Sequence, residues 1–240
     1  MAGFKTHITT SSVLGIAYGG AGALLLRDAN GEIPIATCVL GTGLCSVAGM
    51  LPDLDSDTGV PLRETVAFTA AVVPMLLMDR LGQMGLSSEW LVVLGATIYL
   101  SIRFGIFPLM RRFTVHRGMF HSLPAALIAA ELGFLLCSGE SLTQRYYKGG
   151  AVLLGFMSHL ILDEIYSVDL RHVRIKKSFG TAIKCWGTSN FANIAVYVQV
   201  LILTLVVWKD PQLVDSVERQ LQQGKSVPQI AIEEIKTILR

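Results

Sequence analysis

Charged side chains are scarce in this sequence of 240 residues. Only 16% of the residues are Asp, Glu, Lys or Arg, and the formal net charge is +2. Soluble domains carry roughly 25% charged residues, and nucleic-acid-binding proteins gather Lys and Arg on a basic face, so the composition disfavours both classes. Apolar residues reach 52% without counting the 23 glycines. This balance excludes a disordered chain and indicates an integral membrane protein.

Cysteine is scarce as well. The four cysteines, Cys38, Cys45, Cys137 and Cys185, show no Cys-x-x-Cys spacing, which disfavours a disulfide framework and a thiolate metal site. We expect them to pack as small apolar side chains. The sequence His-Glu-x-x-His is absent too, so an intramembrane metalloprotease of that type is disfavoured.

Apolar segments occur throughout the chain, and a helix of about 20 apolar residues crosses a bilayer core of about 30 Å. The predicted spans are residues 8–26, 34–51, 66–86, 90–110, 120–137, 149–166 and 191–208. The sequence therefore predicts an all-α polytopic membrane helix bundle of about six to seven transmembrane helices over residues 1–208. Residues 209–240 are predicted to form an amphipathic C-terminal tail, with a helix start at Ser226-Val227-Pro228.

Basic residues are distributed unequally between the two sides of this predicted bundle. Counting spans from the N-terminus, the N-terminal side carries ten Lys and Arg residues and the short loops opposite carry four. The positive-inside rule places the richer side in the cytoplasm. Inside the spans, Arg103 and Glu131 lie at similar depths, and because an ionisable group in a membrane is normally paired, we predict an ion pair between them.

Metal-binding residue types occur in four short motifs, and all four motifs fall at helix ends on the predicted cytoplasmic side. The candidate ligands are His7, Asp53, Asp55, His116, His121, His159 and Asp163. A single histidine in an apolar helix is normally a packing residue, and an Asp-rich loop is normally just solvated. Random placement, however, would scatter such residues over both sides of the membrane, so their common location favours a shared site.

The spacing of these residues suits metal coordination. His159 and Asp163 are four residues apart, which puts both side chains on one face of a helix. Asp53 and Asp55 lie in one loop and can bring two carboxylates to one ion or to two adjacent ions. Imidazole with carboxylate favours Zn²⁺, with Mn²⁺ or Fe²⁺ as alternatives. The number of candidates leaves room for one or two ions.

Together the motifs resemble the YdjM-like family of bacterial inner-membrane proteins, described as LexA-regulated, metal-dependent hydrolases. The resemblance covers residues 6–163 and is carried by four motifs: Thr6-His7, Leu51-Pro52-Asp53-Leu54-Asp55, His116-Arg117-Gly118-x-x-His121-Ser122 and Ser158-His159-x-x-x-Asp163. It implies an all-helical fold in the inner membrane, a bound divalent metal and hydrolase activity. A more distant similarity, carried by the Asp loop and the His-x-x-x-Asp helix, is to zinc-dependent phospholipase C.

These observations predict a membrane-bound metal-dependent hydrolase that acts at the cytoplasmic interface on a phosphoester or a lipid-linked phosphate, with the lipid bilayer as its surroundings and no nucleic-acid partner. Besides the metal ligands, Arg117 is expected to hold phosphate and Ser122 to orient a water or a ligand imidazole. Two alternatives stay open: a membrane transporter for metal or another ion, and a non-catalytic membrane protein stabilised by metal.

Overall fold

The structure of the chain is a computed structural model. It describes residues 3–27, 30–55, 60–106, 118–137, 141–169, 174–175, 180, 183–226, 229 and 232, and the side chains of 54–65, 168–169 and 174–175 lie outside this description. The elements are α1 (Phe4–Leu25), α2 (Ile35–Ala48), the 3₁₀ turn η1 (Leu51–Asp55), α3 (Val60–Gln83), α4 (Ser88–Leu100), the π-helical turn η2 (Ser101–Ile106), α6 (Leu123–Leu136), α7 (Leu142–Ile165), β1 (Val168–Asp169), β2 (Arg174–Ile175), α8 (Asn190–Trp208) and α9 (Pro211–Gln222).

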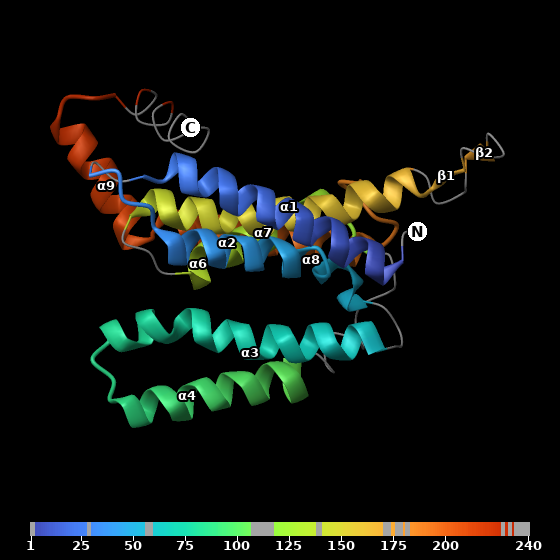
Figure 1. Ribbon diagram of the computed structural model, residues 1–240, viewed down its shortest axis with the longest axis horizontal. Helices are drawn as coiled ribbons and strands as arrows, with labels where there is room; N and C mark the ends of the chain where they lie inside the picture. Colours follow the sequence, from blue (N-terminus) through green and yellow to red (C-terminus); the bar gives the residue numbers. More distant parts are fainter. Residues whose placement is uncertain are drawn as a thin grey trace.

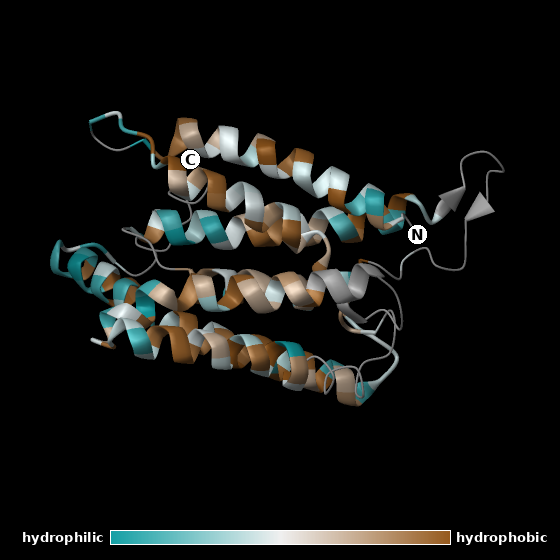
Figure 2. Cartoon of the chain, turned by 60° about the horizontal axis from the view of Figure 1, so that its bottom comes forward, coloured by the Kyte–Doolittle hydropathy of each residue, from teal (hydrophilic) through white to brown (hydrophobic). Residues whose placement is uncertain are grey.

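The described helices form a membrane bundle. Five helical segments are long and apolar enough to cross a membrane, namely Phe4–Leu25, Ile35–Asp53, Val66–Gln83, Ser88–Ile106 and Asn190–Trp208. The apolar helix α6 is shorter, with 14 residues, and α7 has 24 residues but carries charged side chains near both ends. Hydrophobic residues dominate these helices in Figure 2, with hydrophilic ones mainly toward helix ends. The predicted all-α membrane fold is confirmed.

Helix α7 lies at the centre of the bundle. It packs against α1, α2 and α6, while α8 packs on the other side of α6. The α3–α4 pair packs mainly on itself and lies below the other helices in Figure 1. Buried Cys45 and Ala48 of α2 meet Ala151 and Val152 of α7, and Phe156 and Leu160 of α7 meet Ala126 of α6. One face of α7 is covered by these helices, and Arg145, Lys148 and Asp163 of α7 are buried on that face.

Helices α2 and α7 approach each other most closely at Gly155. A Cβ atom added at Gly155 would overlap the backbone carbonyl of Cys45 and lie 3.0 Å from the Cβ of Ala48. Small residues allow helix backbones to approach in this way within a membrane. The contact holds the turn of α7 that follows it, which contains His159, directly against the end of α2.

We expect the substitution Gly155→Ala to lower the free energy of unfolding by about 1–3 kcal/mol, since extra volume in a packed core costs about that much. Thermal unfolding of the detergent-purified chain measures this loss. Gly20→Ala is the matched control, because a Cβ there meets nothing within 4 Å and alanine favours a helix. Equal melting temperatures for Gly155→Ala and the parent would contradict the close approach.

Serine side chains cap the starts of α4, α6, α7 and α8. Ser141 precedes α7 and its hydroxyl accepts a hydrogen bond from the amide of Gln144 at 3.3 Å. Ser122 and Ser189 cap α6 and α8 in the same way. Such N-caps satisfy amides that have no partner within the helix. The cap at Ser141 explains why α7 begins before the predicted boundary at Gly149.

A buried ion pair joins the start of α7 to the segment after α8. The guanidinium of Arg145 donates to both carboxylate oxygens of Asp210, at 2.5 and 2.7 Å, and Arg80 of α3 lies 3.3 Å from the same carboxylate. Burial would by itself raise the pKa of Asp210, but hydrogen bonds from Arg145 and the charges of Arg145 and Arg80 hold this pKa below its usual value.

The predicted tail therefore begins as part of the bundle. Asp210 caps α9 by accepting from the amide of Gln212, and Pro211 occupies the first position of that helix, where proline is favoured. A helix thus starts well before the predicted start at Ser226-Val227-Pro228, of which Val227 and Pro228 lie outside the described residues. The sequence signal that we missed is Asp210-Pro211.

The predicted ion pair between Arg103 and Glu131 is wrong. Glu131 accepts a hydrogen bond from the hydroxyl of Thr204 at 2.6 Å, and the guanidinium of Arg103 lies 5.7 Å from the ring centroid of its neighbour Phe104. Helix α6 packs against α7 and α8, and not against the helical segment that carries Arg103. Helix depth follows from sequence position, whereas the neighbour of a helix depends on tertiary packing.

Candidate metal centre

Four segments that are far apart in the sequence meet at one end of the bundle and place five metal-binding side chains together. These side chains are His7, Asp53, His121, His159 and Asp163, and we refer to them as the His/Asp cluster. Four of the five are almost completely buried, while the side chain of Asp53 keeps 25% of its exposure. Because burying charge without a partner is costly, such a cluster requires charge compensation.

Local structure explains how each side chain reaches the cluster. His7 lies in the first turns of α1, and Asp53 lies in η1, the short turn that follows α2 at the same end of the bundle. His121 directly precedes Ser122, the N-cap residue of α6. His159 and Asp163 lie one turn apart on the buried face of α7.

His159 is at the centre of the cluster. Its Nε2 lies 3.6 Å from Oδ1 of Asp53 and 3.9 Å from Oδ2 of Asp163. His121 Nε2 lies 3.8 Å from the same oxygen of Asp53, and His7 Nε2 lies 3.3 Å from Oδ1 of Asp163. Two ligand atoms on one zinc ion at tetrahedral angles lie about 3.3–3.6 Å apart. The observed separations lie in or just above this range.

A backbone carbonyl orients the ring of His159. Nδ1 lies 2.7 Å from the carbonyl oxygen of Gly49, at the end of α2. A carbonyl can only accept, so Nδ1 carries a proton, and in the neutral ring Nε2 then keeps its lone pair. Nε2 is buried and has no hydrogen-bond partner among the described residues. Metal-binding histidines typically have this arrangement, with the second nitrogen held by a carbonyl or carboxylate.

The rings of the three histidines are in contact. His7 and His159 stack with centroids 3.7 Å apart and an interplanar angle of 12°, and His121 meets His159 edge-on at 5.5 Å. Stacked imidazoles repel if both are protonated, so the stack favours neutral rings. Neutral imidazole is the form that binds metal ions.

The cluster fits a divalent cation in ligand type and in charge. Two overlapping groups of three can hold an ion, His7 with Asp53 and His159, and His121 with His159 and Asp163. Both groups contain His159, and the lone pair of its Nε2 serves one ion. Two carboxylates among neutral imidazoles balance a charge of two on that ion, which explains how two carboxylates can be placed here.

Of the remaining predicted site residues, the structure describes the side chain of Ser122 alone. His116 and Arg117 lie outside the described residues, as does the side chain of Asp55. Ser122 is fully buried, and its hydroxyl donates to the carbonyl of Met119 at 2.5 Å and accepts from the amide of Ala125 at 3.3 Å. Its hydroxyl is thus used to cap α6 and to position the adjacent His121.

Two supporting groups were missed in the sequence. The carbonyl of Gly49 had no sequence signal, because any residue supplies a carbonyl. Asn193 did have one, since it is a polar side chain within the last apolar segment. It is fully buried and exchanges hydrogen bonds of 2.9 and 2.7 Å with the backbone of Gly187. This holds the loop before α8 next to Met119, close to His121.

Comparison with known proteins gives one match. Neither the curated proteins nor the solved structures include a match to this chain, so the likeness to phospholipase C stays an expectation. The family model of the YdjM inner membrane protein matches residues 1–209. The matched region contains α1 to α8 and all five residues of the His/Asp cluster. Together with the apolar helices, this match shows that the chain belongs to the YdjM inner membrane protein family.

Proposed function

We propose that this protein is a membrane-bound, metal-dependent hydrolase and that the His/Asp cluster is its metal centre. The observation that carries the proposal is the orientation of His159, whose Nδ1 contacts the carbonyl of Gly49 while the buried Nε2 faces two carboxylates. The side chains of the cluster come from four separate segments of the chain. The packing of a single helix would not require metal-binding side chains from all four.

The cluster suits Zn²⁺ best, because imidazole and carboxylate ligands in a near-tetrahedral set are typical of zinc; Mn²⁺ and Fe²⁺ accept the same ligands. When bound, such an ion polarises a phosphoryl or carbonyl oxygen and lowers the pKa of water toward about 7. The described residues support one ion, since both ligand groups share His159.

The two carboxylates of the cluster have different surroundings and so take different roles in the proposal. Asp163 is fully buried between His7 and His159 and serves as a ligand. Asp53 is the partly exposed member and marks the side from which water and substrate enter. Its carboxylate is therefore the group that is placed to accept a proton from an attacking water.

A phosphoester or lipid-linked phosphate is the proposed substrate class. The cluster lies at one end of a membrane bundle, where lipid headgroups are within reach. The sequence places half of all Lys and Arg residues on this side, which attracts anionic headgroups and supports a cytoplasmic orientation. The proposed role of Arg117 in holding phosphate belongs to this part of the proposal.

The position of the cluster also bears on the alternatives. Ion transporters bind their substrate near the bilayer midplane, on broken helices. The cluster lies instead in the last turns of α7 and the first turns of α1, with η1 and His121 at the same end. This location favours an interfacial enzyme over a transporter.

Hydrolysis by the detergent-purified chain tests the proposal, with phosphodiesters and phospholipids as the substrate panel. We expect a chelator to abolish hydrolysis and added Zn²⁺ or Mn²⁺ to restore it. Asp163→Asn keeps the shape of the side chain but removes its charge, and we expect it to lower the rate at least about 100-fold. Asp215→Asn, on the exposed face of α9, is the charge-matched control.

Each outcome separates the hypotheses. Bound metal without hydrolysis of any substrate would favour the non-catalytic alternative. Metal uptake into proteoliposomes would favour the transporter. Hydrolysis at the parent rate by the Asp163→Asn protein would contradict the assignment of the cluster as the catalytic centre.

A further inference from the structure

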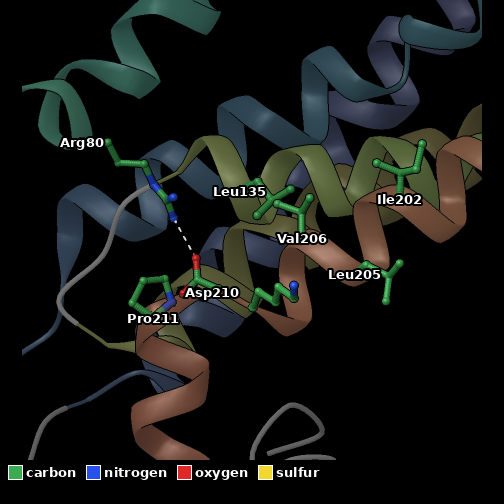
Figure 3. Close-up of a pocket in the computed structure, with 8 residues that line it drawn as sticks. Arg80, Leu135, Ile202, Leu205, Val206, Asp210 and Pro211 are labelled. Atoms are coloured by element: carbon green, nitrogen blue, oxygen red, sulfur yellow. Dashed lines mark hydrogen bonds and ion pairs between the residues drawn. The ribbon is translucent and has the colours of Figure 1, made fainter.

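An apolar surface cavity, open on one side and with a positively charged end, lies far from the His/Asp cluster. It has a volume of about 490 Å³, within the range of about 300–1,000 Å³ that is typical of ligand sites. Leu135 of α6 and Ile202, Leu205 and Val206 of α8 line its apolar part. Arg80 reaches toward Asp210 at the polar end, as Figure 3 shows.

The cavity and the cluster belong to opposite ends of the bundle. Arg145, which holds Asp210, lies in the first turn of α7, whereas His159 is 14 residues further along the same helix. At a rise of 1.5 Å per residue, this separation is about 21 Å along the helix axis. In Figure 1 the N-terminus and α9 accordingly mark opposite ends of the molecule. The cavity therefore faces the other leaflet.

Positive charge exceeds negative charge at the polar end. Arg80, Arg145 and Lys209 gather around one carboxylate, that of Asp210. Arg145 is buried and directs its donors to Asp210, Gln212 and the carbonyl of Phe134. Arg80 donates to Asp210 from Nη2 alone within the described part of the chain, and Lys209 is exposed. Two cations thus have donors available for an anion.

Trp208 indicates the depth of this charged end in the membrane. Its side chain is 68% exposed at the end of the α8 span, and tryptophan is enriched at the level of the lipid headgroups. Lys209 directly follows Trp208, and Ile202 lies about 10 Å deeper in the membrane than Lys209, measured along the helix axis. The charged end is therefore at headgroup level and the apolar part at acyl-chain level.

We propose that this cavity binds one anionic phospholipid of the leaflet opposite the metal centre. Arg80 and Lys209 hold the headgroup phosphate, and an acyl chain lies along Leu135, Ile202 and Val206. The charge excess selects an anionic lipid over a zwitterionic one. Because none of these residues belongs to the His/Asp cluster, this site does not depend on the proposed hydrolase activity.

Quenching of Trp208 fluorescence by brominated lipids tests the site. The full-length chain with Trp90→Phe and Trp186→Phe keeps Trp208 as its reporter and is reconstituted in phosphatidylcholine vesicles. Brominated phosphatidylglycerol is then compared with brominated phosphatidylcholine. Each cation near the membrane surface raises the affinity for an anionic lipid about fivefold. With two cations, we expect the site to prefer phosphatidylglycerol over phosphatidylcholine by about 25-fold in affinity.

Charge variants in the same background make the test specific. We expect Arg80→Gln and Lys209→Gln each to retain a preference of about fivefold, and the double variant almost none. Arg27→Gln removes an exposed arginine at the same end of the bundle and should retain the parent value. Lys209→Gln alters an exposed side chain, so its result does not depend on a change in folding.

Two results would overturn the proposal. One is equal quenching by both brominated lipids in the parent protein, and the other is an unchanged preference in the double variant. A dimer by light scattering in which neither lipid quenches Trp208 would assign the cavity to a second copy of the chain.

Discussion

The substitution His159→Ala is expected to remove most of the divalent metal from the purified protein and to reduce hydrolysis at least about 100-fold. His159 belongs to both possible ligand groups, so its loss leaves neither group complete. Loss of a residue that only hydrogen-bonds to a metal ligand typically costs 10–100-fold in metal affinity or activity, and loss of a ligand itself should cost at least as much. Elemental analysis of detergent-purified protein measures the metal, and the substrate panel measures the rate.

The control for this variant is His172→Ala. His172 is the one histidine of the chain that none of the four motifs contains, and its loss should leave metal content and rate unchanged. A His159→Ala protein that retains the metal content of the parent would contradict the assignment of the cluster as the metal centre.

The second large effect is expected at the other end of α7. We expect Asp210→Ala to lower the free energy of unfolding by about 3–5 kcal/mol, because it leaves the buried guanidinium of Arg145 without its carboxylate. The side chain of Arg145 is only 2% exposed, so water cannot replace the lost partner. Unfolding in detergent, followed by circular dichroism, measures the loss.

Two further variants isolate the ion pair from other effects. Asp215→Ala removes an exposed carboxylate from α9 and should change stability by less than about 0.5 kcal/mol. Adding Arg145→Met to Asp210→Ala removes the buried charge as well and should recover most of the stability. If the double variant were no more stable than Asp210→Ala, the loss would come from the N-cap of α9 and not from the ion pair.

The same pair has a defined pH dependence. Because the pKa of Asp210 is lowered in the folded protein, its carboxylate contributes stability in full above the unfolded value of about 3.9. That contribution is lost as the pH falls through the lower folded value. Acid unfolding of the parent should therefore include a component below about pH 4 that is absent from Asp210→Ala.

Helix α7 connects the two polar regions of the molecule. Its C-terminal turns supply His159 and Asp163 to the cluster, and its first turn supplies Arg145 to the ion pair with Asp210. Between these ends, small residues such as Gly155 and Ala151 pack against α2. A change in how α7 packs would therefore alter both ends together.

Much of the fold follows from local sequence features. Each predicted apolar segment coincides with a helix of the structure, because the length and hydropathy of a span are local properties. The predicted start of α7, at Gly149, comes too late in the sequence. A hydropathy pattern detects neither the N-cap at Ser141 nor the charged first turns of α7, which pack against other helices. The sequence also indicated that Cys38, Cys45 and Cys137 are packing residues, and all three are buried free thiols.

Sequence alone determined the membrane class, the apolar segments that contain helices, and the helix ends that carry His7, Asp53, His121, His159 and Asp163. These follow from hydropathy, helix length and the alternation of sides along the chain. Only the tertiary structure decided which atoms meet: Gly49 with His159, Thr204 with Glu131, and Asp210 with Arg145. The physical reason is that hydropathy and helical periodicity are local, whereas the neighbour of a helix depends on how small and large side chains fit between segments distant in the sequence.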